Sequence, residues 1–208
     1  MSDGTGTGGQ GRDAVTDAER QDDPAHLANL LVQAAGDGDA ELVKQVLGTS
    51  LVDADAQSNE RRTGLDQAVR RGHGRVVSVL IEAGADPGQQ VGAYRETTPL
   101  CLAAAHGHTS VVEALLDAGV HPDTRNRMGH LPLVLAATVG QEGHMSTVDL
   151  LLDRGADIDA EMKGRTALDW AAGFGQGRMV RHLLSRAAAH STAVSVARVT
   201  PCPLTPCF

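Results

Sequence analysis

Apolar and polar positions recur along most of this chain with a period of about 34 residues. Each copy contains a short apolar segment that closes on an alanine, then a glycine turn, then a second segment with adjacent large apolar residues. The marker alanines are Ala34, Ala68, Ala103, Ala136 and Ala171, which gives steps of 34, 35, 33 and 35 residues. A period of this length is typical of stacked repeat units, so the pattern predicts five copies of one helix–turn–helix module.

The copy from Thr98 to Gly119 shows what each module is expected to be. Thr98 suits the N-cap of a first helix, and Pro99 suits the first helical position, where no backbone donor is needed. The second helix has one apolar face, because its large residues recur at helical spacing at Val111, Val112, Leu115 and Leu116. Gly119, like Gly84 and Gly155, is expected to end its second helix in a left-handed conformation.

Turn glycines and apolar pairs are expected at equivalent places in all five copies. The glycines are Gly38, Gly72, Gly107, Gly143 and Gly175. The apolar pairs are Val46/Leu47, Leu80/Ile81, Leu115/Leu116, Leu151/Leu152 and Leu183/Leu184. Burying each such side chain contributes about 1.5–3 kcal/mol, but a single module cannot cover its own apolar face. The modules are therefore expected to stack.

Short motifs identify the repeat more closely. They are Thr98-Pro99-Leu100, Ala103-Ala104, Gly107-His108 and Gly84-Ala85-Asp86. This pattern resembles the ankyrin repeat over roughly residues 27–186. The resemblance implies an all-α ankyrin-repeat solenoid of stacked helix–turn–helix units with short hairpin connections. It divides a domain of residues 25–186 into repeats at about 27–56, 57–91, 92–124, 125–159 and 160–186.

The sequence departs from the ankyrin pattern in several places. The histidine expected after Thr-Pro-Leu is replaced by Asp66, Cys101, Val134 and Asp169. Leu131 stands where a threonine is expected, and about three extra residues around Val139–Glu142 predict an added helical turn or a bulged loop. Ala187 stands in place of the last glycine stop, so residues 187–208 are expected to form an irregular C-terminal tail. Residues 1–24, which are polar and Gly-rich, are expected to be a disordered N-terminal tail.

Composition narrows the classes of function. The formal net charge of −8 argues against general nucleic-acid binding. A signal-peptide pattern and an apolar run of membrane-spanning length are both lacking, so a cytoplasmic monomer is expected. The motifs of phosphate-binding loops and of catalytic nucleophiles are lacking as well, so we expect no enzyme activity and no cofactor.

Histidine and cysteine are the residue types that would hold a transition metal. His73, His108 and His144 occupy the Gly-His position of the resemblance, which implies rings that bond backbone groups at the turns between repeats. The chain lacks three or four ligands with the spacing that zinc needs, so no metal site is expected. Cys101 is expected to be a small packing residue inside a first helix, and Cys202 and Cys207 are expected to be free thiols.

The resemblance also implies that partners contact the hairpin tips and the solvent-facing side of the first helices. Carrying those positions over gives a candidate binding set of Arg62, Arg70, Arg71, Tyr94, Arg95, His106, Arg125, Arg127, Met128, His130, Met162, Lys163, Arg165 and Phe174. Its eight Arg and Lys residues, with the neighbouring Glu60, give a formal charge of +7, against −8 for the whole chain. This segregation favours a basic concave face that binds an acidic protein surface, as a scaffold or inhibitor. Tyr94, Met128, Met162 and Phe174 would be its apolar anchors.

Other interpretations of the same surface stay open at this point. The basic face could bind nucleic acid or another anionic ligand, the chain could be a regulatory subunit of an enzyme, or the arginines could only keep a solenoid soluble. Trp170 is expected to pack against the neighbouring repeat rather than contact a partner. The extra residues near Gly140 are either a specificity element or a tolerated insertion.

Overall fold

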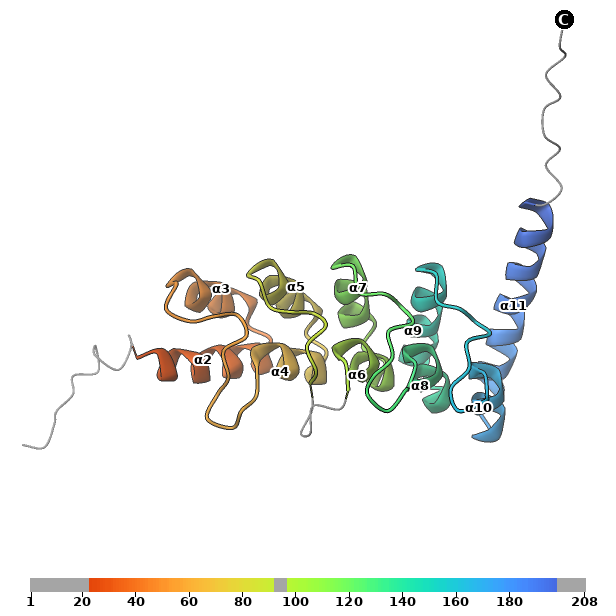
Figure 1. The fold of residues 1–208 in the computed structure, drawn as a ribbon, viewed down its shortest axis with the longest axis horizontal. Helices are drawn as coiled ribbons and strands as arrows, with labels where there is room; N and C mark the ends of the chain where they lie inside the picture. Colours follow the sequence, from red (N-terminus) through yellow and green to blue (C-terminus); the bar gives the residue numbers. More distant parts are fainter. Residues whose placement is uncertain (1–22, 92–96, 198–208) are drawn as a thin grey trace, which may run out of the picture.

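The computed structural model describes residues 23–91 and 97–197, which form two rows of helices along one axis (Figure 1). The row of first helices is α2 (Pro24–Asp37), α4 (Gly64–Arg71), α6 (Pro99–His106), α8 (Pro132–Val139) and α10 (Ala167–Gly173). The row of second helices is α3 (Ala40–Gly48), α5 (Gly74–Glu82), α7 (Thr109–Asp117), α9 (Glu142–Asp153) and α11 (Gly177–Ala197). From α2 to α10 each first helix packs against the next first helix, and α3, α5, α7 and α9 do the same. The described chain is therefore an all-α solenoid, as predicted.

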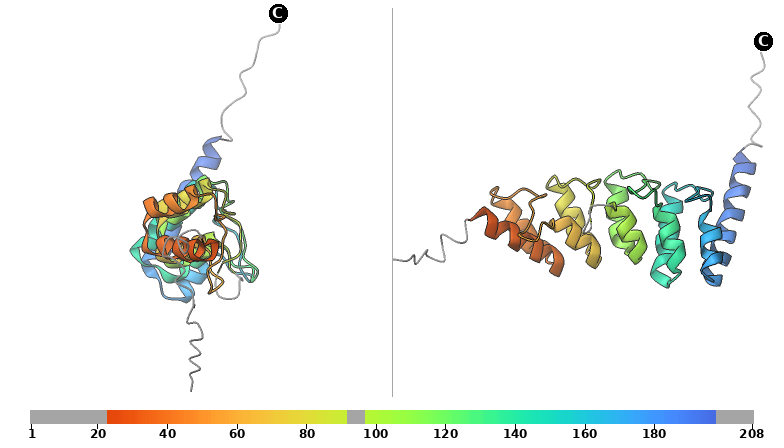
Figure 2. Two further views of the ribbon diagram at one scale, coloured as in Figure 1. Left: turned by 90° about the vertical axis from the view of Figure 1, so that its left-hand side faces the viewer. Right: turned by 60° about the horizontal axis from the view of Figure 1, so that its bottom comes forward.

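Short hairpins connect the repeats, and viewed along the solenoid these connections lie together on one side of the helices (Figure 2). Isolated antiparallel bridges join Gln57 to Thr63, Val91 to Thr97 and Met162 to Arg165. In the fourth repeat the hairpin closes through a hydrogen bond from Asn126 N to His130 O, at 3.2 Å. These turns carry the residues that the sequence places at the hairpin tips.

Threonine side chains start three of the first helices. Thr63, Thr98 and Thr166 each accept a hydrogen bond from the backbone N–H three residues on. In α10 the Asp169 carboxylate also accepts from the backbone N–H of Thr166, which completes a capping box. Leu131, which has no side-chain acceptor, leaves the start of α8 without this bond.

A continuous core runs the length of the solenoid. The five marker alanines are at most 1% exposed, which lets neighbouring first helices approach closely. Large residues from both rows, such as Leu100 and Leu115, are fully buried between repeats. Gly84, Gly119 and Gly155 follow their second helices with φ of 100°, 87° and 91°, as predicted. The repeats thus cover one another's apolar faces.

The fourth repeat corrects one detail of the sequence alignment. Its left-handed turn glycine is Gly140, with φ of 69°, whereas Gly143 lies inside α9. The extra residues form an added turn at the start of α9, which has 12 residues where α5 and α7 have nine. The bulged loop is therefore excluded.

The C-terminal helix corrects a second prediction, that residues 187–208 are irregular. Helix α11 continues through this region to Ala197. The reason is that residues 187–197 contain alanine and no Gly or Pro, so no residue stops the helix where Ala187 replaces glycine. Residues 1–22 and 198–208, which hold most of the predicted N-terminal tail and both Cys202 and Cys207, lie outside the described residues. No helix in the described ranges is long and apolar enough to cross a membrane.

Candidate functional site

A ladder of side chain-to-backbone hydrogen bonds fixes how successive repeats face one another. It joins His73 Nε2 to Gly36 O (2.9 Å), His108 Nε2 to Arg70 O (3.0 Å), His144 Nε2 to Ala105 O (3.1 Å) and Gln176 Nε2 to Thr138 O (3.3 Å). Each acceptor is a carbonyl in the last turn of a first helix, where no intrahelical donor is available. Residues at equivalent positions of adjacent repeats therefore lie side by side.

The ladder confirms the predicted role of the three histidines. A carbonyl oxygen can only accept, so in each of these three bonds the ring nitrogen Nε2 is the donor and carries a proton. Gln176 takes the same place in the last repeat, which the sequence analysis missed because glutamine does not match the Gly-His motif. Among the residues that the structure describes, no three His, Cys, Asp or Glu side chains are grouped so as to hold a metal ion.

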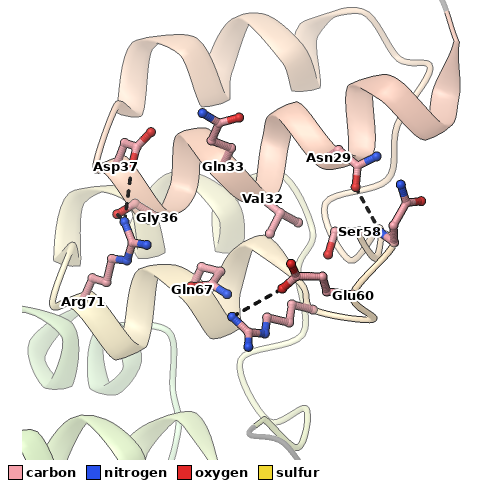
Figure 3. A pocket seen from close by; sticks show the side chains of 11 residues that line it. Asn29, Val32, Gln33, Gly36, Asp37, Ser58, Glu60, Gln67 and Arg71 are labelled. Atoms are coloured by element: carbon pink, nitrogen blue, oxygen red, sulfur yellow. Dashed lines mark hydrogen bonds and ion pairs between the residues drawn. The ribbon is translucent and has the colours of Figure 1, made fainter.

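The N-terminal end of the face formed by first helices and hairpins contains a polar pocket of about 470 Å³ (Figure 3). Helix α2, helix α4 and the hairpin before α4 line it, and Asn29 Oδ1 accepts the backbone N–H of Asn59 at 3.0 Å. Two ion pairs cross or border the pocket, Arg62–Glu60 at 3.6 Å and Arg71–Asp37 at 3.3 Å. The charges in this pocket therefore largely satisfy one another.

Arg70 is neutralised as well, since its Nε lies 3.2 Å from the buried carboxylate of Asp66. Three of the eight basic residues in the candidate set thus have a carboxylate partner, and two of those partners, Asp37 and Asp66, are absent from the sequence-based charge count. Counting these two carboxylates with the set lowers its formal charge from the +7 that the sequence suggested to +5. Sequence reasoning missed the pairing with Asp37 because it joins residues 34 positions apart.

The hairpins before α8 and α10 carry cations that form no ion pair with a described carboxylate. Arg125 donates to the carbonyls of Gly129 (3.1 Å) and Glu161 (3.0 Å), which ties the two hairpins together. Arg127 and Lys163 are exposed and form no ion pair or hydrogen bond with any described residue. These two charges are available to an external ligand.

Aromatic side chains lie next to the last of these hairpins. The guanidinium of Arg165 lies 5.5 Å from the centroid of Trp170, a cation–π arrangement. Trp170 donates from Nε1 to Met162 O at 3.1 Å and stacks on Phe174, with ring centroids 6.0 Å apart and an interplanar angle of 19°. Phe174 is 59% exposed, so the stacked pair presents an apolar surface to solvent.

Comparison with known protein families decides what this arrangement of repeats is. The family described as ankyrin repeats (3 copies) matches residues 31–126 and again residues 100–193, which together span more than half of the chain. The chain belongs to the ankyrin-repeat family. No curated protein matches it. Ankyrin repeats generally mediate protein–protein interactions, and ankyrin-repeat proteins are typically non-catalytic.

The candidate residues that the structure describes are exposed or half-buried, with Met162 as the exception. Met162 is 5% exposed and belongs to the core, so it cannot be an apolar anchor. The tight turn through Lys163 and Gly164, with φ of 54° and 73°, and the bridge to Arg165 set Met162 at the inner end of the hairpin. Met128, at 56% exposed, remains at a hairpin tip.

Two histidines of the candidate set serve local structure as well as facing solvent. His106 is exposed, bonds Leu102 O through Nδ1 at 2.8 Å, and stacks on His108 with centroids 5.6 Å apart. His130 is half-buried, and its backbone N–H donates to Asn126 Oδ1 at 2.9 Å. Tyr94 and Arg95, the remaining candidates, lie outside the described residues.

Proposed function

We propose that this ankyrin-repeat chain is a non-catalytic protein-binding module, a scaffold or inhibitor, whose first-helix and hairpin face binds an acidic segment of a partner protein. The observation that carries the proposal is the pair of exposed cations, Arg127 and Lys163, at the tips of adjacent hairpins. Neither has a carboxylate partner among the described residues, although the chain as a whole carries −8. A local group of positive charges on a chain whose net charge is negative favours encounter with an acidic surface.

The internal ion pairs of the face strengthen this choice of residues. Exposed pairs such as Arg62–Glu60 contribute only about 0.2–1 kcal/mol to stability, and their charges offer a partner little net attraction. Arg127 and Lys163 contribute nothing comparable to the fold. Their charges are therefore the ones whose reversal should change binding and leave folding intact.

The test uses the full chain as bait for affinity capture, with captured proteins identified by mass spectrometry and then purified. Titration calorimetry of each purified partner compares wild type with the double variant Arg127→Glu/Lys163→Glu. The control is Arg75→Glu/Arg181→Glu, which reverses two exposed arginines in the other row of helices; Arg75 pairs with Glu41 at 3.0 Å, an exposed ion pair whose loss costs little stability. Circular dichroism verifies that both variants keep their helices.

We expect the hairpin variant to weaken binding at least tenfold and the control to change it less than twofold. Equal affinity of wild type and the hairpin variant would refute the proposal. A fluorescent DNA duplex of random sequence is titrated in parallel. Binding as tight as that of the protein partner, with a steep loss of affinity at higher salt, would show that the face binds anions in general.

A further inference from the structure

Two positions of every repeat lie on one side of the first helix. The residue before the marker alanine is half-buried in three copies, exposed at Gln33 and buried at Gln67, and the residue three places after that alanine is exposed in all five. These positions are four residues apart, so they lie one above the other on the same side of a helix. The first series is Gln33, Gln67, Leu102, Leu135 and Trp170. The second series is Asp37, Arg71, His106, Val139 and Phe174. The ladder between repeats keeps both series in register across the solenoid.

The chemistry of this face changes from one end to the other. At α2 and α4 the two series supply Gln33, Asp37, Gln67 and Arg71, which we term the polar half and which line the pocket of Figure 3. Here Arg71 Nη1 donates to Gly36 O at 2.9 Å and pairs with Asp37. Any partner that docks on the polar half must compete with bonds that already exist.

At α8 and α10 the same positions supply Leu135, Val139, Trp170 and Phe174, which we term the apolar half. These two helices pack against each other, and the bond from Gln176 to Thr138 O brings their C-terminal ends together. Val139 and Phe174 are 36% and 59% exposed, while Leu135 and Trp170 are half-buried beside them. Helix α6, with Leu102 and His106, lies between the two halves.

The candidate cations without a carboxylate partner lie at the apolar half, whereas Arg61, which is outside the candidate set, is an exposed cation of the hairpin before α4 with no ion pair among the described residues. Arg165 covers one side of Trp170, and Arg127 and Lys163 are on the hairpins that lead into α8 and α10. The nearby Asp169 is held mainly by the backbone N–H and the hydroxyl of Thr166, at 3.0 and 2.9 Å, and it interacts with Arg165 only through a weaker coulombic attraction. An exposed aromatic surface and cations with free capacity therefore occur at the same end of the solenoid.

We propose that partners dock on the apolar half, through a segment that places a bulky aliphatic or aromatic side chain over Val139 and Phe174 and acidic residues against Arg127, Lys163 and Arg165. The inference rests on the proposed function and adds the place and the chemistry of the bound segment. Charge complementarity selects an acidic protein segment as the occupant, because the three cations border the apolar surface. The apolar contact supplies the anchor, since exposed aromatic residues that become buried dominate binding at such surfaces.

The probe is a random 12-residue peptide library displayed on phage and selected against the immobilised full chain. We expect enriched peptides to combine Asp or Glu with Leu, Ile, Phe, Tyr or Trp. Their dissociation constants, measured by fluorescence polarisation, should rise at least tenfold with Phe174→Ala and with Arg127→Glu/Lys163→Glu. Asp37→Ala, which changes the equivalent exposed position in the polar half, should alter them less than twofold.

Other results would overturn the inference. Enriched peptides without acidic or without bulky apolar residues, no enrichment at all, or equal sensitivity to Asp37→Ala and Phe174→Ala would each do so. A dimer that light scattering detects in wild type and that Phe174→Ala dissociates would make a second copy of the chain the occupant. If a captured partner protein is lost with Arg127→Glu/Lys163→Glu but not with Phe174→Ala, the proposed function stands and this inference fails. If neither variant affects capture, both fail.

Discussion

The hydrogen-bond ladder predicts that two glycines with nearly the same backbone conformation tolerate alanine very differently. Gly72 and Gly119 have φ of 83° and 87°, so an alanine at either position carries the left-handed penalty of about 1–2 kcal/mol. At Gly119 no described heavy atom lies within 4 Å of the added Cβ. At Gly72 the Cβ would lie 2.8 Å from Nδ1 and 3.0 Å from Cε1 of His108. Only Gly72→Ala therefore forces a side chain of the neighbouring repeat to move.

The additional cost at Gly72 comes from the ladder bond between His108 Nε2 and Arg70 O, at 3.0 Å. Displacing the ring loses about 0.5–1.5 kcal/mol for the bond, and up to about 3 kcal/mol if the carbonyl of Arg70 finds no other donor. We therefore expect Gly119→Ala to lower the free energy of unfolding by about 1–2 kcal/mol. Gly72→Ala should lower it by about 1.5–5 kcal/mol, the sum of the two effects.

Urea unfolding followed by circular dichroism at 222 nm measures both variants. The double variant Gly72→Ala/His108→Ala separates the two effects, because without the imidazole the alanine at position 72 should cost no more than the alanine at position 119. The expected coupling between the two substitutions is about 0.5–3 kcal/mol, the contribution of the ladder bond. Equal destabilisation by Gly72→Ala and Gly119→Ala, or a coupling near zero, would show that the ladder does not hold the repeats together.

Three further predictions concern burial and protonation. Met162→Ala should destabilise the chain by about 2–5 kcal/mol because Met162 is in the core, whereas Phe174→Ala should cost less than about 1 kcal/mol because Phe174 is exposed. Similar unfolding midpoints of the two variants in urea would contradict the burial of Met162. The backbone N–H of Thr166, followed by its hydroxyl, holds the pKa of Asp169 below its ordinary value of 3.8. The stability that the Asp169 carboxylate contributes is therefore present above pH 3.8 and is lost as the pH falls through its lower pKa in the folded chain. The unfolding midpoints of wild type and Asp169→Asn should converge in acid, and midpoints that keep a constant difference would contradict this. Burial raises the pKa of the Cys101 thiol. Iodoacetamide at pH 8 should therefore label Cys101 far more slowly in the folded chain than in the urea-unfolded chain, as measured by peptide mass mapping. Equal labelling rates would show that the thiol is accessible.

Local features of the fold could be predicted because their causes lie within a few residues of one another. Thr98 caps α6 through a bond to Cys101 N three residues away, and Gly119 ends a helix through its own φ. The wrong turn glycine in the fourth repeat has a local origin too. Gly140 and Gly143 are both available, and only the length of α9 decides between them.

The candidate site was harder to predict because its properties depend on side chains from different repeats. From the sequence alone Arg71 is predicted to be a free cation, but in the structure it pairs with Asp37 of the preceding repeat. Met162 reads as a surface anchor, yet the turn after it sets the side chain in the core. Arg127 and Lys163 keep the charge that the sequence assigns to them.

The sequence by itself determined the period, the two-helix module and the need to stack, since each module carries an apolar face that it cannot cover alone. Only the tertiary structure decided how the exposed face is divided. Arg62 and Arg70 pair with carboxylates two and four positions away, but the neutralisation of Arg71 by Asp37 depends on distances between residues of different repeats, 34 positions apart. Those distances are set by the stacking of repeats, which the ladder of His73, His108, His144 and Gln176 holds in register.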